Sequence, residues 1–363
     1  MTTTQKPLRA GVIGLGMGRA HAEAYAKLEN AELVALCDIS EARLMEHAKR
    51  LNLPETACYT DYNVMLNEAD LDIVSVALPN SLHAPVTIDL LNGGVNVICE
   101  KPLAISVADA QRMIDTAAAN NKRLMVMYNK RYRADMQWIG HMIRQGKIGD
   151  VYHVNASWRR ETGIPARGWF GDKTLAGGGP LFDLGVHVLD MVLWALDFPK
   201  VETVSGQVRA NFGTRKLKTW GDLTEDFTVE DGAVGFLRLA GDVSMILQAT
   251  WAEHGKPGED RLYVEIQGTE GTLIMDVPNY VEGDNVTYYT EINGTPSVVT
   301  PHIDWNVPHG IEGFIRRTID ALNNGTPAPA EGDQGIITVG ILEAIYESAR
   351  TRREIVFDEI LSV

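Results

Sequence analysis

The sequence predicts two domains: an α/β domain with a doubly wound parallel sheet, and an α+β domain with a large, mostly antiparallel open sheet. Three observations support this fold class. The chain has 363 residues, enough for two domains. Short apolar runs alternate with helix-period segments in the first third, and successive strands without intervening helices dominate afterwards. We therefore expect one domain over residues 1–128 and a second over residues 129–363.

The first domain is predicted from apolar runs that do not alternate, each followed by an amphipathic segment. The runs predict strands at residues 9–15, 32–37, 71–77, 95–99 and 123–127. The segments between them predict helices at residues 19–28, 41–51, 84–92 and 108–120. Such strands are typical of a parallel sheet covered on both faces, which favours a nucleotide-binding domain of the Rossmann type.

The second domain is predicted from segments that alternate polar with apolar residues. Strands are expected at residues 151–158, 201–208, 231–239, 243–250, 262–267, 271–275 and 286–290. Turn signals such as Ala240-Gly241-Asp242 separate several of them. Helices are expected at residues 183–196, 310–323 and 335–352. Consecutive strands of this kind indicate a mostly antiparallel sheet.

Composition excludes several classes of partner. The chain has 48 acidic and 33 basic residues, a formal net charge of −15, and nucleic acids and anionic membranes require a basic surface. No apolar run approaches the roughly 20 residues that span a bilayer, and no apolar leader is present at the start, so we expect a cytoplasmic protein. The cysteines, Cys37, Cys58 and Cys99, match no metal-binding spacing, and no metal site is expected.

A glycine-rich loop follows the first predicted strand. Gly14, Gly16 and Gly18 allow a tight turn, and with Met17 they bring backbone amides near the start of a helix, where a pyrophosphate can bind. The usual spacing places the third glycine at position 19, which is Arg19 here. The loop is thus one residue tighter than usual, and the packing of the helix against the strand is left open.

Asp38 ends the second predicted strand, a little over 20 residues beyond Gly14. A carboxylate there can accept the hydroxyls of the adenosine ribose and would repel a 2′-phosphate, so NAD is favoured over NADP. Arg43 can either pair with Asp38 or tolerate a phosphate. Asp38 can also be read as the N-cap of the next helix, a position that Ser40 could fill equally well.

Three side chains form a candidate catalytic set. Lys101 follows a strand of the parallel sheet, at the edge where ligands bind in such folds. Asp183 and His187 are four residues apart and share one face of a predicted helix. His187 can take a hydroxyl proton, Lys101 can stabilise the resulting alkoxide character, and Asp183 can orient the imidazole or bind a substrate hydroxyl. Alternatively, Asp183 and His187 form a hydrogen bond on the surface, and Lys101 is a solvated surface residue. Asp190 shares the helix face and is expected to have a structural role, as a cap or in a pair.

Four motifs in this order resemble those of the glucose–fructose oxidoreductase/inositol dehydrogenase (Gfo/Idh/MocA) family. They are the glycine loop at 14–18 followed by His21, the segment Pro79-Asn80-Ser81-Leu82-His83, the segment Glu100-Lys101-Pro102, and Asp183-x-x-x-His187. The resemblance covers essentially the whole chain. It implies a tightly bound nicotinamide cofactor, substrates among sugars, cyclitols and their derivatives, and homodimers or homotetramers assembled through the open sheet.

The resemblance also implies roles for individual residues. Lys101 looks like the catalytic lysine, Asp183 its polar partner and His187 the acid/base. The residues implied on the cofactor side are Leu78, Pro79, Asn80, His83, Glu100, Lys101 and Asn129, in addition to the glycine loop, Asp38 and Arg43. Asn129 and Arg131 match a motif that lines the cleft between the domains in relatives, and the Lys101–Pro102 peptide is expected to be able to adopt the cis form, as it does there.

Substrate contacts are harder to infer. Besides Lys101, Asp183 and His187, the candidates are Arg159 at the end of a predicted strand, Trp169 and Phe170, and His309 in a loop. The glycines at 177–179 lead into the catalytic helix and can line the substrate or simply connect two elements. Two alternatives to a sugar or cyclitol dehydrogenase stay open: an enzyme that recycles its NAD within each turnover to cleave or isomerise a glycoside, and a non-catalytic nucleotide sensor.

Overall fold

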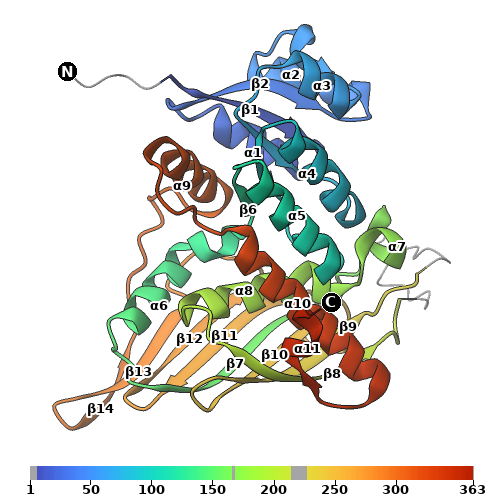
Figure 1. Cartoon of the computed structure of the whole chain (residues 1–363). Helices are drawn as coiled ribbons and strands as arrows, with labels where there is room; N and C mark the ends of the chain where they lie inside the picture. Colours follow the sequence, from blue (N-terminus) through green and yellow to red (C-terminus); the bar gives the residue numbers. More distant parts are fainter. Residues whose placement is uncertain (1–5, 166–167, 214–226, 363) are drawn as a thin grey trace. The chain divides into compact units, whose positions relative to one another are not determined.

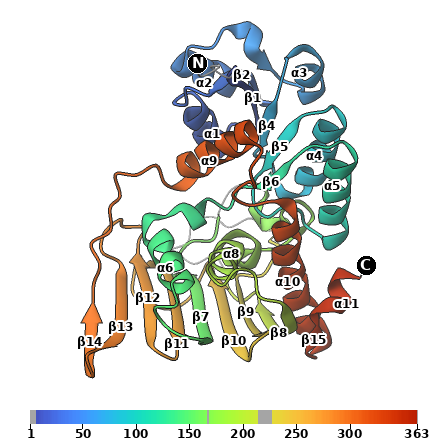
Figure 2. The same cartoon turned by 60° about the vertical axis from the view of Figure 1, so that its left-hand side comes forward.

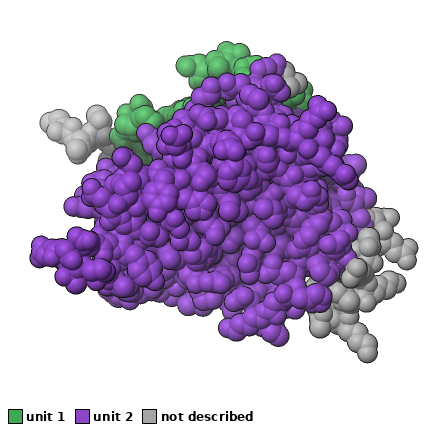
Figure 3. Space-filling model, turned by 90° about the horizontal axis from the view of Figure 1, so that it is seen from below, with its two compact units in different colours: residues 1–104, 108–129, 308–336 green, residues 105–107, 130–307, 337–363 purple. Residues whose placement is uncertain are grey.

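The computed structural model describes residues 6–165, 168–213 and 227–362. The chain divides into two compact units. Unit 1 comprises residues 1–104, 108–129 and 308–336, and unit 2 comprises residues 105–107, 130–307 and 337–363 (Figure 3). The change at residue 129 lies beside the expected domain boundary, whereas segment 308–336, which we expected in the second domain, belongs to unit 1.

Unit 1 is built around a parallel sheet with the strand order β3-β2-β1-β4-β5-β6. Its strands are β1 (Leu8–Ile13), β2 (Ala31–Cys37), β3 (Cys58–Tyr59), β4 (Ile73–Val76), β5 (Asn96–Cys99) and β6 (Leu124–Val126). Its helices are α1 (Gly18–Tyr25), α2 (Glu41–Leu51), α3 (Tyr62–Glu68), α4 (His83–Asn92), most of α5 (Val107–Ala119) and α9 (Gly310–Asn324). This strand order is that of a dinucleotide-binding Rossmann fold, with its ligand-binding crevice beyond the carboxyl ends of β1 and β4.

Helix α9 joins unit 1 although it lies almost 300 residues from α1 in sequence. The two helices lie side by side (Figure 2). Lys27 forms an ion pair with Glu312 at 2.8 Å, and Asn30 donates a hydrogen bond to Asp320 at 2.8 Å. Both contacts are exposed, so the apolar face of α9, which buries Phe314, Ile315 and Ile319, supplies most of the stabilisation.

Unit 2 is built on a nine-stranded sheet with the order β14-β13-β12-β11-β7-β10-β9-β8-β15. All neighbouring strands pair antiparallel except β7 and β10, which are parallel. The strands are β7 (Val151–Arg160), β8 (Val201–Arg209), β9 (Gly232–Leu239), β10 (Val243–Thr250), β11 (Asp260–Gly268), β12 (Gly271–Pro278), β13 (Val286–Ile292), β14 (Thr295–Val299) and β15 (Ile355–Val356). The predicted fold class, including the mostly antiparallel open sheet, is confirmed.

Helices cover one face of this sheet (Figures 1 and 2). They are α6 (Ala134–Arg144), α8 (Val186–Ala195) and α10 (Gly332–Thr351), the last of which begins in unit 1; the short helices α7 (Lys173–Ala176) and α11 (Phe357–Leu361) also belong to unit 2. The covered face buries side chains such as Val154, Ala156, Leu247, Val264, Ile266 and Leu273. Residues that alternate with them, among them Asn155 and Tyr263, remain half-buried on the open face, which Figure 3 views from outside.

Candidate active site

The glycine loop of residues 14–18 joins β1 to α1 in unit 1. Gly14 has a φ of +85°, and a Cβ there would lie 2.3 Å from the carbonyl oxygen of Ala77, so only glycine fits. A Cβ at Gly16 would meet no atom within 4 Å. The backbone is therefore accessible at Gly16, as the approach of a pyrophosphate requires, and these residues fit a dinucleotide.

Gly18 fixes the start of α1 against the sheet. A Cβ at this position would lie 2.8 Å from Cγ1 of Val12 and 3.2 Å from Cβ of Ala77. Gly18 thus provides the close helix–strand packing that the usual third glycine provides one residue later. The packing that the sequence left open is settled by the early glycine, because Arg19 is already inside the helix.

Asp38 lies at the carboxyl end of β2 and is only 5% exposed. Its carboxylate accepts the backbone N–H of Leu15 at 2.7 Å and that of Ser40 at 2.9 Å. Arg43 donates to the same carboxylate at 2.9 Å. Asp38 therefore ties the glycine loop to β2, and Arg43 pairs with it, one of the two roles expected for that arginine. Ser40, not Asp38, is the N-cap of α2.

His83 joins the two loops that follow β4 and β5. Its Nδ1 lies 2.7 Å from the carbonyl oxygen of Pro102, and its Nε2 lies 2.9 Å from that of Leu78. Burial lowers the pKa of the imidazole, although both carbonyls act to raise it. A ring nitrogen that carries a proton donates to the carbonyl oxygen that it faces. The Lys101–Pro102 peptide held by this ring is cis, as the resemblance implied.

Glu100 is a buried carboxylate next to the predicted catalytic lysine. Its Oε1 lies 2.9 Å from Nε2 of His21, and its Oε2 accepts the backbone N–H of Lys101 at 3.1 Å. Burial acts to raise the pKa of Glu100, but the hydrogen bond and charge of His21, together with Lys101, outweigh it, so the pKa lies below its usual 4.5. An anionic Glu100 thus holds the backbone of Lys101, whose side chain is half-buried.

The Asp183–His187 segment of unit 2 differs from the regular helix that the sequence predicted. Asp183 lies in a π-helical turn, Leu181–Gly185, and His187 lies in the first turn of α8. Pro180 precedes the turn as its N-cap. Of the described residues in segment 181–195, Asp183, His187 and Trp194 alone are not buried. This segment therefore presents two polar side chains from an otherwise apolar helix, which is common for π-helical turns at functional sites.

Asp183 has one hydrogen-bond donor and one charged neighbour that the sequence analysis did not select. The indole N–H of Trp251 donates to its Oδ2 at 3.0 Å, and Nη1 of Arg160 lies 4.0 Å from the same oxygen. Arg160 also donates to Asp260 at 2.8 Å, and Trp158 donates its indole N–H to Asp260 at 2.7 Å. Asp183 is thus an oriented carboxyl group beside a guanidinium.

Aromatic rings surround His187. The ring of Trp158 lies 5.8 Å from that of His187 and 5.0 Å from that of Tyr280, measured between centroids. Nζ of Lys130 lies 4.7 Å from the centroid of Tyr280, within cation–π range. Tyr280 has a φ of +57°, a left-handed conformation that is unusual for a bulky residue and found at functional sites. We call Lys130, Trp158, Arg160, Asp183, His187, Trp251, Asp260 and Tyr280 the Asp183–His187 cluster.

Arg159, a predicted substrate contact, is not part of this cluster. It lies on the open face of the sheet, where its Nε pairs with Glu253 at 3.0 Å. It lines a cavity of about 320 Å³ with Asn155, Ser157, Gln248, Arg261 and Tyr263. Because side chains alternate along β7, Trp158 and Arg160 face α8 while Arg159 faces away. Arg160 is the arginine that the structure brings to Asp183.

The other predicted substrate contacts also lie outside the cluster. Trp169 and Phe170 are half-buried and stack on each other, with ring centroids 4.2 Å apart. His309 is the N-cap residue of α9 and belongs to unit 1, as does Asn129. Asp190 forms an ion pair with Arg131, whose Nε donates at 2.8 Å, so the structural role expected for Asp190 is confirmed.

Metal-binding clusters and membrane-spanning helices are both absent from the described residues. Across residues 6–165, 168–213 and 227–362, no three His, Cys, Asp or Glu side chains gather in a way that could hold a metal ion. None of the helices in this described part of the chain is both long and apolar enough to cross a bilayer.

Models of known protein families match parts of both units. The GFO_IDH_MocA family model, an oxidoreductase family with an NAD-binding Rossmann fold, matches residues 8–128, and that of the GFO/IDH/MocA C-terminal domain matches residues 136–274. D-glucoside 3-dehydrogenase of Escherichia coli K12 is 30% identical over 358 residues, which cover 96% of this chain and 97% of the relative. The chain belongs to the GFO/IDH/MocA oxidoreductase family. The resemblance is thereby confirmed, and the protein is an NAD-binding oxidoreductase.

Further matches show how far this GFO/IDH/MocA oxidoreductase resembles other proteins. The crystal structure of an oxidoreductase domain protein from Kribbella flavida superposes with a TM-score of 0.85 at 24% identity, covering 97% of this chain and all of the other. That likeness shows the fold alone. A glycosyl hydrolase family 109 protein of Shewanella sp. ANA-3 is 36% identical over 162 residues, which cover 42% of this chain and 35% of the relative.

Some of the cluster residues that were not predicted are adjacent in sequence to predicted ones, and others are not. Arg160 and Trp158 stood beside the chosen Arg159, and Lys130 stood within the motif that supplied Asn129. Which of Arg159 and Arg160 points toward Asp183 depends on the face of β7 that α8 covers. No local sequence pattern reveals that face. Asp260, Trp251 and Tyr280 carry no local signal, since strand pairing alone brings them near β7. Asp260 lies in β11, Trp251 follows β10, and Tyr280 follows β12, which pairs with β11.

Proposed function

We propose that this GFO/IDH/MocA oxidoreductase reversibly oxidises a ring hydroxyl of a sugar or glycoside, with His187 as the acid/base. The observation that carries the proposal is the Asp183–His187 cluster: two half-buried polar side chains on a buried helix, beside Trp158 and Arg160. The relationship to D-glucoside 3-dehydrogenase supports a glycoside substrate. A cyclitol such as inositol offers the same chemistry and stays a prediction.

The composition of the cluster suits a polyol. Tyr280, which is 40% exposed, offers an apolar ring face to the C–H face of a sugar ring, and the buried ring of Trp158 packs beside it. Arg160, Asp183 and Asp260 offer a donor and acceptors for the hydroxyls of that sugar. An apolar ring face and charged hydrogen-bonding groups together match the C–H face and the hydroxyls of a sugar ring. The cluster therefore supports a hydroxyl-rich, cyclic substrate over a flat aromatic or a long aliphatic one.

The proposed proton path follows from the surroundings of His187. Its Nδ1 is buried, so we assign removal of the hydroxyl proton to Nε2. Asp183, oriented by Trp251, would accept a neighbouring hydroxyl and favour the protonated imidazole electrostatically. Lys101 would donate to the reacting oxygen and stabilise its developing negative charge, with its backbone held by Glu100. NAD, when bound, supplies the hydride acceptor.

On the cofactor side we propose that Gly14, Gly16, Met17 and Gly18 bind the pyrophosphate. The two oxygens of Asp38 accept bonds from Leu15, from Ser40 and, at both oxygens, from Arg43, which together match the roughly four lone-pair sites of a carboxylate. A ribose hydroxyl would therefore take the place of Arg43 on this carboxylate. Its charge supports NAD over NADP. The remaining cofactor-side assignments, for which the resemblance is the support, are Leu78, Pro79, Asn80, His83, Glu100 and Asn129.

We also propose a homodimer or homotetramer that covers the open face of the nine-stranded sheet. That face carries half-buried apolar side chains, such as Ile246 and Ile274, between polar ones. Light scattering after size exclusion would give the mass in solution. A monomer at micromolar concentration would rule the assembly out. A cytoplasmic location stays a prediction.

The partial match to a glycosyl hydrolase family 109 protein favours one alternative: cleavage of a glycoside with the cofactor regenerated in each turnover. Net formation of NADH separates the two functions. A dehydrogenase produces one NADH for each sugar oxidised, whereas the alternative releases the aglycone without net NADH.

Two substitutions test the proposed chemistry. Lys101→Ala and His187→Ala are each expected to lower kcat by at least ~100-fold, because each removes a group that acts on the reacting hydroxyl. Affinity for NAD, measured by fluorescence titration, should change little for His187→Ala. Turnover is measured as NADH formation from glucosides, aldoses and inositols.

Matched controls replace exposed residues of the same types. Lys200 pairs with Asp358 with 65% of its side chain exposed, and His302 has 90% of its side chain exposed. Lys200→Ala and His302→Ala should keep wild-type turnover. Unchanged kcat in both Lys101→Ala and His187→Ala would remove the proposed mechanism.

A further inference from the structure

The dipeptide Glu230-Asp231, which precedes β9, is buried although both side chains are acidic. Glu230 is 6% exposed and Asp231 is 0% exposed. Neither residue belongs to a motif that the sequence analysis identified. Buried carboxylates are retained at a cost unless their oxygens are satisfied, so their partners indicate what they do.

Glu230 accepts two backbone N–H groups from the turn that leads into the π-helical turn. Oε2 accepts the N–H of Gly179 at 2.9 Å, and Oε1 accepts the N–H of Leu181 at 3.1 Å. These two amides flank Pro180, and Leu181 is the first residue of the turn that contains Asp183. One side chain therefore fixes the backbone at the point where this turn begins.

Close approaches at this turn explain Gly178 and Gly179. A Cβ at Gly179 would lie 2.0 Å from the carbonyl oxygen of Glu230, and a Cβ at Gly178 would lie 2.0 Å from the hydroxyl oxygen of Tyr346. The turn thus approaches Glu230 and Tyr346 more closely than any other residue type allows. The glycines permit this approach, so the bonds to Glu230 can form.

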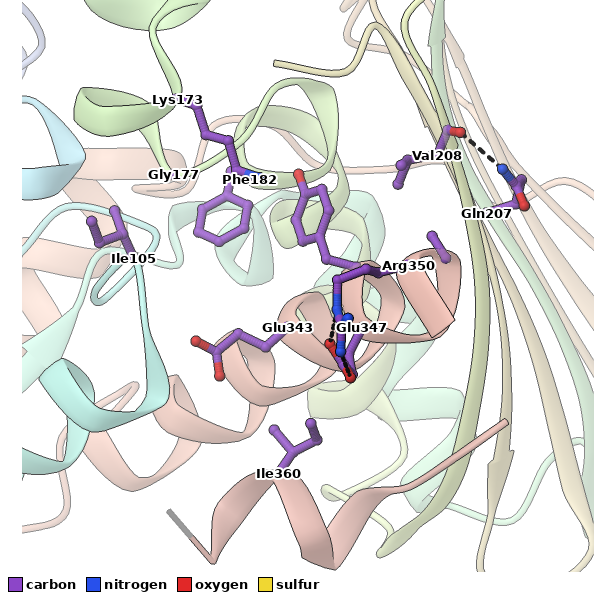
Figure 4. Close-up of a pocket in the computed structure, with 12 residues that line it drawn as sticks. Ile105, Lys173, Gly177, Phe182, Gln207, Val208, Glu343, Glu347, Arg350 and Ile360 are labelled. Atoms are coloured by element: carbon purple, nitrogen blue, oxygen red, sulfur yellow. Dashed lines mark hydrogen bonds and ion pairs between the residues drawn. The ribbon is translucent and has the colours of Figure 1, made fainter. Parts of the chain in front are cut away.

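Packing alone does not hold this turn. A cavity of about 620 Å³ borders it, lined by Gly177 and Phe182 on one side and by Glu343, Tyr346 and Glu347 of α10 on another. Figure 4 shows Gly177 and Phe182 at the edge of this cavity. Residues 178–182 of the turn are buried despite this cavity, so packing and the charge-assisted hydrogen bonds to the carboxylate hold the turn together.

Asp231 supports Asp183 from the opposite direction. Its carbonyl oxygen accepts the backbone N–H of Trp251 at 3.0 Å, and the indole N–H of Trp251 donates to Asp183 at 3.0 Å. Its carboxylate pairs with Arg209 at 2.8 Å. The dipeptide therefore reaches Asp183 by two routes: through the backbone of the π-helical turn and through Trp251.

We propose that Glu230 is a positioning residue that sets the place of Asp183 in the reaction by holding the amides of Gly179 and Leu181. This inference rests on the proposed role of Asp183. A neutral amide in place of the carboxylate can accept only one of the two N–H groups, because its nitrogen is a donor. Glu230→Gln therefore releases one side of the turn while it keeps the size of the side chain.

The test is a double-mutant cycle of kcat with Glu230→Gln and Asp183→Asn. Glu230→Gln alone should lower kcat roughly 10- to 100-fold with a smaller change in KM, because a misplaced group affects the reaction more than binding. In the Asp183→Asn background the same change should lower kcat by no more than about two-fold, since the group that it positions is already lost. Additive losses, or wild-type kcat in Glu230→Gln, would overturn the inference.

The controls separate this inference from the proposed function. Asp135 is 0% exposed and accepts the backbone N–H of Met136, so Asp135→Asn matches the removal of a buried carboxylate elsewhere in unit 2 and should keep kcat. Wild-type kcat in Asp183→Asn would refute the role of Asp183 itself, whatever Glu230→Gln does. If Glu230→Gln does not fold, Glu230→Asp replaces it and should show the same loss of kcat. Failure of both to fold would make Glu230 purely structural and contradict the inference.

Discussion

Glu100 shows how a single residue links the fold to the chemistry. Its carboxylate is buried, pairs with His21, and accepts the backbone N–H of the lysine that we propose to act on the substrate oxygen. The lowered pKa of Glu100 reflects these contacts, because they outweigh the effect of burial. Glu100 is therefore ionised in the folded protein at neutral pH.

This charge predicts how stability depends on pH. A carboxyl group whose pKa is lower in the folded state stabilises it above its unfolded pKa, near 4.5, and loses that contribution as the pH falls through the folded value. The wild type should therefore exceed Glu100→Gln in free energy of unfolding at neutral pH, and the difference should shrink below pH 4.5. Urea titrations across this range measure it. A difference that stays constant down to acid unfolding would contradict the assignment.

For single residues, the sequence predicted the types of side chain in the candidate site, but it did not always predict which of two adjacent residues lies there. Glu100, Lys101, Asp183 and His187 were predicted, and their local contacts follow from strand ends and one helical segment. Arg160 was passed over for Arg159, because alternation shows that the two point to opposite faces but does not say which face a helix will cover. The dependence of Asp183 on Glu230 joins residues about 50 positions apart and leaves no local pattern.

Among the elements, the glycine loop divides its tasks between residues. Gly14 makes the turn, Gly16 leaves the backbone accessible, and Gly18 lets α1 pack against β1. The tighter spacing of the glycines still serves all three functions. Gly18, the first residue of α1, allows the close packing that a glycine at position 19 usually allows.

Two substitutions separate binding from packing in this loop. Gly16 lacks the positive φ of Gly14, and a methyl group there meets no protein atom, so Gly16→Ala should leave thermal stability unchanged. The methyl group would instead meet the bound pyrophosphate at a cost of roughly 1–3 kcal/mol, which raises the Kd for NAD roughly 5- to 150-fold. Gly18→Ala should lower the free energy of unfolding by a similar amount of about 1–3 kcal/mol, because its Cβ would press on Val12.

Isothermal titration with NAD and thermal unfolding of both variants provide the comparison, each variant being the control for the other. Equal loss of stability in the two, or wild-type NAD affinity in Gly16→Ala, would refute this division of tasks.

Prediction of the elements succeeded where periodicity was strong. Helix α2 and strand β10 have the predicted bounds, and most other predicted elements are correct within a few residues. The two-residue strands β3 and β15 were missed, because so short a run has no period, and the longer elements α3, α6 and β14 were not predicted either. The π-helical turn was predicted as part of a regular helix, since no local sequence pattern marks it.

In the molecule as a whole, the sequence predicted two sheets but not the full path of the chain between units. Residues 308–336 belong to unit 1, where α9 packs beside α1. Nothing within α9 distinguishes a helix of the first unit from one of the second, because its apolar face fits either sheet domain. Only the complementary surface of α1, far away in sequence, decides the matter.

The net charge of −15 is consistent with the function that we propose. An acidic chain binds an anionic cofactor through backbone amides and helix ends rather than through a basic surface, as the glycine loop does.

The central claim is tested most directly by following the hydrogen itself. The wild-type enzyme is mixed with NAD and a methyl glucoside deuterated at every ring carbon, and the cofactor product is examined by mass spectrometry. Our account predicts one deuterium on the reduced cofactor, one oxidised ring carbon per turnover, and slower turnover than with the unlabelled sugar. Product that forms while the cofactor stays oxidised and unlabelled would contradict it.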